Sequence, residues 1–317
     1  MKLNADNKDM TELKADKLTE IFGDLLEFNK DLAQFSSYKT GGKATLFISV
    51  TTIEELSDTL KKTKNLNIPY VILGGGTNVL ISDSGFDGLI IKMDIKGMEI
   101  FEKSKIICGA GENLEDLIIF SSKNSLTGLE FAAGIVGSVG GAVYGNAGAY
   151  GGEIGNIVES VTVIDKNGEI KNISHSEADF GYRDSVFKKT GDIITQIIFQ
   201  LEKGDKKAIQ SKIDETLSVR HEKLPYDQCS AGCFFKNIPD NTQPHGKLAA
   251  GKLLEDIGAK NMKYGGAEIS EKHANIIINT GKATSNDILT LAERIKVKVK
   301  EKFGILLEEE IVKIGKF

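Results

Sequence analysis

Two glycine-rich segments, residues 74–78 and 134–152, carry the clearest chemical signal in the chain. Backbone N–H groups can surround the pyrophosphate of a dinucleotide only where no Cβ blocks their approach, so loops that bind it are rich in glycine. The first segment, Gly74-Gly75-Gly76-Thr77-Asn78, adds a hydroxyl and an amide as further donors. A single glycine triplet fits a tight turn between strands equally well. The second cluster favours a dinucleotide-binding site.

The spacing of the glycines argues against a nicotinamide-binding Rossmann unit. That fingerprint requires Gly-x-Gly-x-x-Gly between a strand and a helix. Residues 74–79 and 109–114 both begin with Gly-x-Gly, but Val79 and Leu114 stand where the third glycine is needed. The dinucleotide is therefore expected to be held by another fold.

The elements that must position these loops follow from the hydrophobic pattern. Apolar residues at helical spacing predict an amphipathic N-terminal helix over residues 13–32. Further helices are expected over residues 52–62, 114–122, 209–221, 251–257 and 285–303. Strands are expected over residues 44–50, 70–73, 79–82, 89–93, 105–108, 157–165, 169–173, 193–201, 275–279 and 309–314.

At 317 residues the chain exceeds the size at which one hydrophobic core stops growing. A charged break at residues 203–207 is a plausible boundary. We therefore expect three domains, over residues 1–100, 101–206 and 207–317.

Composition excludes several classes of protein. The net charge is −5 with the basic residues dispersed, so no basic field would attract nucleic acid. No stretch is long and apolar enough for a membrane helix, and residues 1–17 lack the apolar core of a secretory signal. Three cysteines, an odd number, argue against a disulfide framework. We expect a cytoplasmic protein, without a membrane partner and monomeric.

The cysteines and histidines do not predict a metal site. Cys229 and Cys233 lie four residues apart, but no further Cys or His stands at a compatible spacing. The four histidines show no ligand spacing either.

Several segments, taken in order, closely resemble the UDP-N-acetylenolpyruvoylglucosamine reductase family over about residues 35–315. They are residues 73–80, 128–131, 134–137, 146–151, 180–185, 230–237 and 250–253. The resemblance implies an α+β protein with a two-subdomain FAD-binding domain of the vanillyl-alcohol-oxidase type, followed by an α+β substrate domain. The short spacing between Arg183 and Cys233 is similar to the family's second type, which lacks an insertion in the substrate domain.

The resemblance also implies a reaction in peptidoglycan synthesis. NADPH gives a hydride to FAD, the flavin passes it to C3 of UDP-N-acetylglucosamine enolpyruvate, and an acid protonates C2 to give UDP-N-acetylmuramate. Arg183 and Glu310 match the residues that polarise the substrate carboxylate, and a guanidinium suits that task because it is always charged and forked. Cys233 stands where the family usually has the proton-donating serine, and an unperturbed thiol, with a pKa of about 8.5, is a stronger acid than an alcohol.

Each catalytic assignment has a plainer alternative. Arg183 could be a surface arginine, and Cys233 a small cysteine that only packs. Glu310 belongs to the run Glu308-Glu309-Glu310, which could be a solvated charge cluster. Strand alternation places Glu308 and Glu310 on one face and Glu309 on the other, and the assignment of Glu310 depends on register.

The binding residues also follow from the resemblance. The FAD-binding residues implied are Gly74, Gly75, Gly76, Thr77, Asn78, Gly134, Gly137, Ser138, Gly141, Ala142, Asn146, Ala147 and Gly148. The substrate-binding residues implied are Tyr182, Arg220, Lys223 and Asn237. Val136 and Ile238 replace prolines that are usual in the family, which leaves the geometry of two loops open.

Two other functions use parts of the same pattern. A flavoprotein oxidase that reacts with O₂ would keep the glycine segments but not the set of Arg183, Cys233 and Glu310. A non-catalytic UDP-sugar-binding module would have no use for an FAD site.

Overall fold

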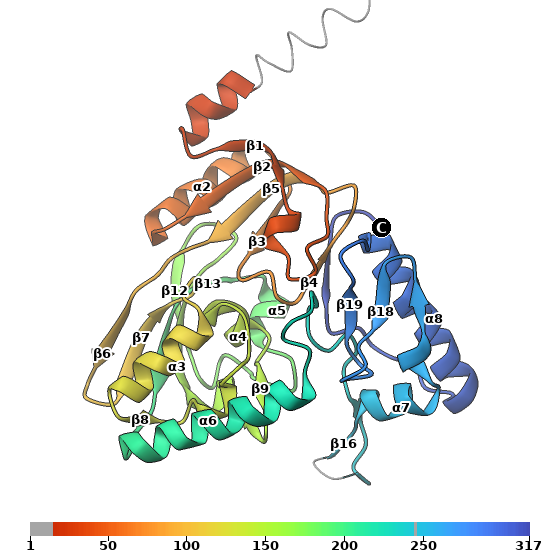
Figure 1. Ribbon diagram of the computed structural model, residues 1–317. Helices are drawn as coiled ribbons and strands as arrows, with labels where there is room; N and C mark the ends of the chain where they lie inside the picture. The colour runs from red at the N-terminus through yellow and green to blue at the C-terminus, as the bar shows by residue number, and fades with distance from the viewer. Residues whose placement is uncertain (1–14, 244–245) are drawn as a thin grey trace, which may run out of the picture.

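Three lobes make up the molecule, each with a sheet of its own (Figure 1). The computed structural model describes residues 15–243 and 246–317. In Figure 1 the first lobe lies at the top, the second at the lower left and the third, in blue, at the right. The α+β architecture expected from the sequence is confirmed.

The first lobe contains a four-stranded mixed sheet and helix α2. Strands β1 and β2 are antiparallel, whereas β2, β5 and β3 are parallel to one another. Thr52 caps helix α2, because its hydroxyl accepts a bond from the Glu55 amide and the Glu55 carboxylate accepts one from the Thr52 amide. The elements are β1 (Glu27–Asp31), β2 (Lys43–Val50), α2 (Ile53–Asn65), β3 (Tyr70–Leu73) and β5 (Phe86–Met93).

The second lobe contains a five-stranded antiparallel sheet in the order β12-β11-β13-β7-β6. Its core is continuous with that of the first lobe, since one cluster of buried side chains joins them. The elements are β6 (Met98–Phe101), β7 (Lys105–Gly109), α3 (Leu114–Lys123), α4 (Val139–Tyr144), β11 (Val158–Ile164), β12 (Ile170–Ser174), α5 (Val186–Thr190) and β13 (Ile193–Gln200).

Helix α6 (Lys206–Lys223) lies beneath the second lobe in Figure 1. Its Ile209 and Ile213 enter the core shared by the first two lobes. The helix therefore packs with the second lobe, although the predicted boundary at residue 207 assigns it to the third. The three-domain division stays a prediction.

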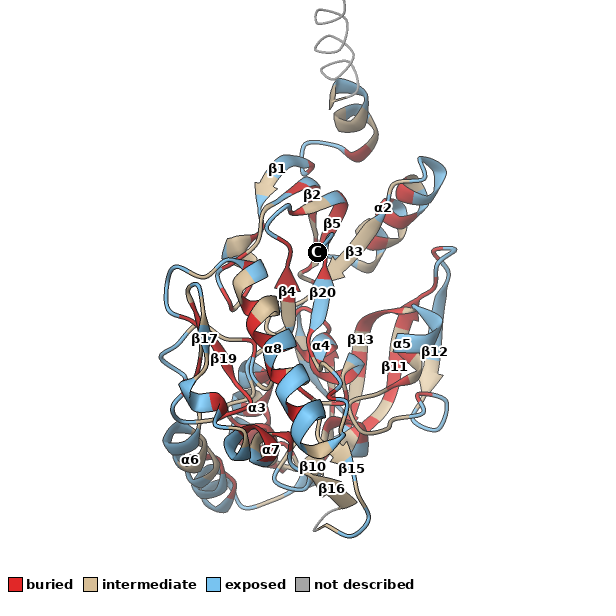
Figure 2. Ribbon diagram, turned by 90° about the vertical axis from the view of Figure 1, so that its right-hand side faces the viewer, coloured by how far each residue is buried: buried red, intermediate tan, exposed pale blue. Residues whose placement is uncertain are grey.

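The third lobe packs two helices against a three-stranded antiparallel sheet. The predicted helix over residues 285–303 is confirmed as α8, whose buried residues form one face in Figure 2. The elements are α7 (Ala250–Asp256), β17 (Lys263–Tyr264), β18 (Ala267–Ile269), β19 (Ile277–Asn279) and α8 (Ser285–Phe303). Over residues 15–243 and 246–317, no helix has both the length and the apolar character needed to cross a bilayer.

Short strands complete the lobes and their connections. They are β4 (Val79–Ile81), β8 (Leu126–Thr127), β9 (Gly148–Ala149), β10 (Gly152–Glu153), β14 (Glu202–Lys203), β15 (Ile238–Pro239), β16 (Lys247–Leu248) and β20 (Val312–Ile314). Strand β20 returns to the first lobe and pairs in parallel with β4. The end of the chain is thus fixed beside the first glycine-rich loop, which directly precedes β4.

The predicted helix over residues 13–32 is wrong in its second half. Residues 15–22 are helical, and residues 13 and 14 lie outside the described part. Gly23 ends the helix in the left-handed region at φ +85°, where glycine carries no Cβ penalty. Residues 27–31 then form β1, since pairing with the edge of β2 satisfies their backbone groups.

The predicted strand over residues 309–314 is shorter than expected. Only residues 312–314 pair as β20, whereas Glu309 makes an isolated bridge with Phe235. Glu310 lies between these two pairings, so the end of the chain contacts two different lobes in succession.

Asn279 joins the third lobe to the first, and its loss is expected to destabilise the whole protein. Its side-chain amide donates to the Tyr38 carbonyl at 2.8 Å and accepts from the amides of Gly281 and Ala283 at 2.8 and 2.9 Å. The residue is buried. Asn279→Ala leaves three backbone groups unpaired and should cost about 2–4 kcal/mol of unfolding free energy, measured by urea denaturation.

Asn172→Ala is the matched control, because Asn172 is exposed on β12 and its side chain bonds to no residue in the described part of the chain. That variant should change the unfolding free energy by less than about 0.5 kcal/mol. Equal effects of the two substitutions would contradict the role given to Asn279.

Candidate active site

The first glycine-rich loop joins β3 to β4 and lies against the second glycine segment. The Gly75 amide donates to the Ser138 hydroxyl at 3.2 Å. A Cβ on Gly75 would lie 2.8 Å from the Ser138 nitrogen, and one on Gly137 would lie 2.7 Å from the Thr77 hydroxyl. Glycine is required at these positions because the two segments approach each other closely.

Gly76 is constrained in two ways. Its φ is +67°, and a Cβ there would lie 1.8 Å from the carbonyl oxygen of Phe35. A side chain would therefore move the loop away from the η1 turn (Ala33–Phe35). The loop backbone is held in one conformation by this packing.

Backbone amides at the junction of the two segments have no protein partner. Within residues 15–243 and 246–317, no acceptor pairs with the amides of Gly76, Thr77, Asn78, Gly137 or Ser138. Unpaired N–H groups from adjoining loops form the kind of concavity that binds phosphate. The junction thus fits the pyrophosphate of a dinucleotide such as FAD.

Other predicted FAD-binding residues are used within the protein. Asn146 is 1% exposed, and its amide donates to Glu153 and to the Gly181 carbonyl and accepts from the Gly155 amide. This residue braces the loop after α4. The Gly141 amide donates to the Ser138 hydroxyl, which caps α4.

The remaining residues of this group lie beside the junction. Ala142 is buried in the core, and Ala147 packs against it. The Gly148 carbonyl accepts a hydrogen bond from the side chain of Arg183, and the Gly134 carbonyl accepts one from the Tyr226 hydroxyl. Direct contacts of the predicted FAD-binding residues with the cofactor stay predictions.

Arg183 and Glu310, to which the resemblance gives the same catalytic task, form an ion pair. Arg183 Nε donates to Glu310 Oε1 at 2.6 Å, and Arg183 Nη2 donates to the Gly148 carbonyl at 3.2 Å. The side chains are 23% and 18% exposed, so both are largely shielded from solvent. Arg183 also has φ +55°, in the left-handed region that favours glycine. The fold holds this arginine in an unusual conformation next to its partner.

Cys233 and Glu310 belong to one small layer of extended segments. Cys233 pairs with Ile276, and the Glu310 amide donates to the Phe234 carbonyl at 2.8 Å. Asn275 braces this layer, since its side chain donates to the Phe235 carbonyl at 2.7 Å and accepts from the Phe235 amide at 3.0 Å. The thiol and the carboxylate are thus fixed relative to each other.

The surroundings of Cys233 keep its thiol protonated. Burial, together with the negative charge of Glu310, raises the pKa of Cys233 to about 11, although the positive charges of Arg183 and Arg220 act to lower it. This pKa is above the 8.5 of a free thiol. The thiol is therefore protonated at neutral pH, and its low thiolate fraction makes it a poor nucleophile.

Of the predicted substrate-binding residues, Tyr182 and Asn237 lie beside the ion pair, whereas Arg220 and Lys223 lie at the end of α6. The Tyr182 hydroxyl accepts from the Asn237 amide at 3.3 Å, and the Arg183 guanidinium lies 5.4 Å from the Tyr182 ring centre. Arg220 stands in the last turn of α6. Lys223 ends the same helix, is exposed, and forms no ion pair or hydrogen bond with a residue that the structure describes.

Four residues near the site were missed from the sequence. Lys188 Nζ donates to the Arg183 carbonyl at 2.6 Å, and Lys247 Nζ lies 3.5 Å from the centre of the Tyr182 ring. Tyr226 bonds to Arg220, and Tyr150 lies beside the same guanidinium. Lys188 lies in the short helix α5, Lys247 in the two-residue strand β16, and the two tyrosines in loops. Segments this short have no periodic pattern that distinguishes a site residue from a surface one.

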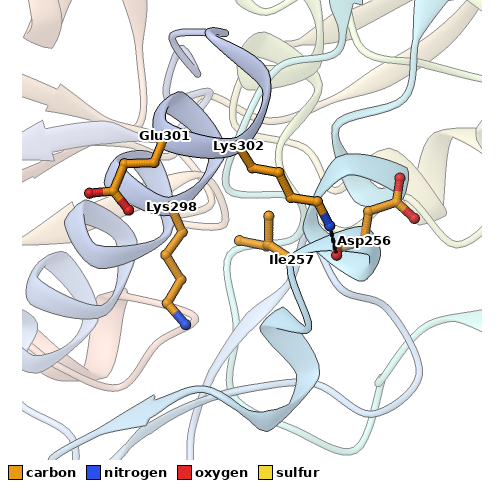
Figure 3. A pocket seen from close by; sticks show the side chains of 5 residues that line it. All are labelled: Asp256, Ile257, Lys298, Glu301 and Lys302. Atoms are coloured by element: carbon orange, nitrogen blue, oxygen red, sulfur yellow. Dashed lines mark hydrogen bonds between the residues drawn. The ribbon is translucent and has the colours of Figure 1, made fainter.

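A polar surface pocket between α7 and α8 contains none of the predicted site residues (Figure 3). It is lined by Asp256, Ile257, Lys298, Glu301 and Lys302. The described part of the chain also contains no cluster of three or more His, Cys, Asp or Glu side chains that could hold a metal ion.

Comparisons with known families cover most of the chain. The FAD binding domain family matches residues 44–174, and the family described as UDP-N-acetylenolpyruvoylglucosamine reductase, C-terminal domain, matches residues 224–314. The first match includes both glycine segments. The second includes Cys233 and Glu310.

Whole relatives agree with these matches. The UDP-N-acetylenolpyruvoylglucosamine reductase of Clostridium novyi is 43% identical over 90% of this chain and 90% of its own length. That of Caldanaerobacter subterraneus is 40% identical over 96% of this chain and 99% of its own. The crystal structure of the Thermus caldophilus enzyme superposes with a TM-score of 0.75 at 32% identity, covering 91% of this chain and 98% of that one. The chain belongs to the UDP-N-acetylenolpyruvoylglucosamine reductase family.

Proposed function

We propose that this chain catalyses the reduction of UDP-N-acetylglucosamine enolpyruvate to UDP-N-acetylmuramate in peptidoglycan synthesis, with bound FAD and with NADPH as reductant. The observation that carries the proposal is the convergence of Arg183, Glu310 and a protonated Cys233. Relatives of 43% and 40% identity with this enzyme name support it. An oxygen-dependent oxidase would not need this set of three residues.

When bound, FAD carries a hydride from NADPH to C3 of the enolpyruvyl group. The unpaired amides of residues 76–78 and 137–138 would hold its pyrophosphate. Arg183 binds the substrate carboxylate and stabilises the negative charge that develops as C3 gains the hydride. Glu310 orients the guanidinium through Nε.

Cys233 completes the addition. Its thiol gives a proton to C2, and this protonation converts the enol-like intermediate into the saturated ether. Solvent then reprotonates the thiolate. The Sγ–H bond breaks and a C–H bond forms, so one hydride and one proton are consumed in each turnover.

The cytoplasmic location and the monomeric state remain predictions from the sequence.

The reaction can be followed in two half-reactions of the purified protein. We expect a yellow protein with flavin absorbance at about 450 nm. Anaerobic NADPH should bleach this absorbance, and UDP-N-acetylglucosamine enolpyruvate should restore it. Rapid reoxidation by O₂ without any response to the enolpyruvyl substrate would instead indicate an oxidase, and a colourless protein that binds UDP-sugars would indicate a binding module.

Substitution of Cys233 should affect only the second half-reaction. Cys233→Ala should leave flavin reduction by NADPH intact and slow reoxidation by the substrate about 10²–10⁴-fold, the usual contribution of a general acid. Cys233→Ser should remain active, because an alcohol at this position can also donate a proton. Cys229→Ala, four residues away, is the matched control and should behave as the unmodified protein. Normal turnover by Cys233→Ala would place the acid elsewhere.

The pH dependence should report the raised pKa of the thiol. Because Cys233 must be protonated to act and its pKa is about 11, reoxidation by the substrate should stay level from pH 7 to about 9.5 and fall only at higher pH. Stopped-flow absorbance measures this rate directly. Cys233→Ser should show no such fall, since an alcohol does not titrate in this range. A fall of the reoxidation rate with a midpoint at about pH 8.5, the pKa of a free thiol, would contradict a buried proton donor.

A further inference from the structure

Arg220 presents a guanidinium that is only partly paired. Its Nε donates to the Tyr226 hydroxyl at 2.9 Å. Across residues 15–243 and 246–317, neither terminal nitrogen has a hydrogen-bond partner and no carboxylate lies within ion-pair distance. The two terminal NH₂ groups of an arginine lie in one plane and can donate two parallel hydrogen bonds to a phosphate or a carboxylate.

Tyr226 is itself fixed by two further contacts. Its hydroxyl donates to the Gly134 carbonyl at 2.6 Å. The same hydroxyl therefore accepts one hydrogen bond, from Arg220, and donates another, to the second glycine segment. Its ring packs on His221, with ring centres 4.4 Å apart. The phenol therefore has little freedom to rotate away from Arg220.

The backbone of Gly134 is shaped to receive this pair. Gly134 has φ +78°, and a Cβ there would lie 2.6 Å from the Tyr226 hydroxyl and 3.1 Å from Arg220 Nε. A side chain at residue 134 would thus displace both groups. The close approach ties the last turn of α6 to the segment that adjoins the phosphate-binding amides.

Arg220 faces the site at which the reaction is proposed to occur. Its positive charge is one of the influences on the thiol of Cys233, which places the two side chains in the same neighbourhood. The guanidinium also lies 5.9 Å from the ring centre of Tyr150. The guanidinium of Arg220 therefore lies between Tyr226 and Tyr150, close enough to Cys233 for its charge to act on the thiol.

We propose that Tyr226 is a positioning residue, which holds the Arg220 fork in the orientation that binds an anionic group of the UDP-sugar substrate. This inference rests on the proposed function, because Arg220 must meet the substrate for its orientation to matter. Tyr226 touches neither the reacting atoms nor the hydride path. Its loss should weaken substrate binding without slowing the chemical steps.

The test is steady-state kinetics of Tyr226→Phe, a change that removes one oxygen atom from a partly exposed ring. We expect KM for UDP-N-acetylglucosamine enolpyruvate to rise about fivefold to tenfold, as is usual for the loss of one hydrogen bond, with kcat within about twofold. Bound flavin and the thermal unfolding midpoint should be unchanged. A merely structural role would lower flavin content or stability instead, without this split between KM and kcat.

Tyr264→Phe is the matched control. The Tyr264 ring lies 4.2 Å from the Arg294 guanidinium in the third lobe, away from the proposed site, and its hydroxyl bonds to no residue that the structure describes. KM should therefore stay within about twofold of the unmodified value. An equal rise of KM in both tyrosine variants contradicts a specific role for the Tyr226 hydroxyl.

Arg220→Ala separates this inference from the function on which it rests. KM should rise at least as far as in Tyr226→Phe, and adding Tyr226→Phe to Arg220→Ala should have no further effect. If Arg220→Ala raises KM but Tyr226→Phe does not, the positioning role is wrong and the proposed function stands. If Arg220→Ala leaves KM unchanged, Arg220 does not bind the substrate and the inference fails. If the unmodified protein does not turn over the substrate, the proposed function itself fails.

Discussion

The ion pair between Arg183 and Glu310 is the interaction on which the site depends. The two residues are 127 positions apart and come from the second lobe and the end of the chain. Charges that are largely shielded from water attract each other strongly only when their geometry is good, and an unpaired charge in the same place is costly. The position of each group is therefore set by backbone contacts as well as by the pair itself.

Those contacts join the carboxylate to all three lobes. The Glu310 amide donates to the Phe234 carbonyl next to Cys233, and Asn78 of the first glycine loop donates to the Glu310 carbonyl at 3.1 Å. Directly afterwards β20 pairs with β4. Glu310 thus links the first glycine-rich loop, the segment that contains Cys233, and Arg183. The glycine segments serve the same purpose, because their missing side chains allow the two loops to meet and leave several amides free for phosphate.

Much of the fold was predictable where local rules act alone. The limits of α8 and β3 agree with the apolar pattern. Strand β1 was missed because its formation depends on the edge of β2, a partner that no local window contains. The shortening of the last strand has the same origin, since Glu309 pairs with Phe235 and not with β4.

The choice of Arg183 and Glu310 came only from the family pattern, because three consecutive glutamates give no local reason to choose Glu310, and their ion pair emerged only in the structure. Tyr226 had no such signal. Its role arises from the three-dimensional meeting of an arginine, a carbonyl and a phenol, which come from a helix end and two loops. Braces such as Asn275 are equally invisible in one sequence, since a buried asparagine has no distinctive spacing.

A double-mutant cycle of Arg183→Gln and Glu310→Gln, measured as the rate at which the enolpyruvyl substrate reoxidises the reduced flavin, tests the central pair most directly. If the two groups act as one unit, each single variant should be slowed and the double variant should be no slower than the slower of the two. Effects that multiply independently would contradict the pair, because they would mean that Arg183 and Glu310 serve the reaction separately.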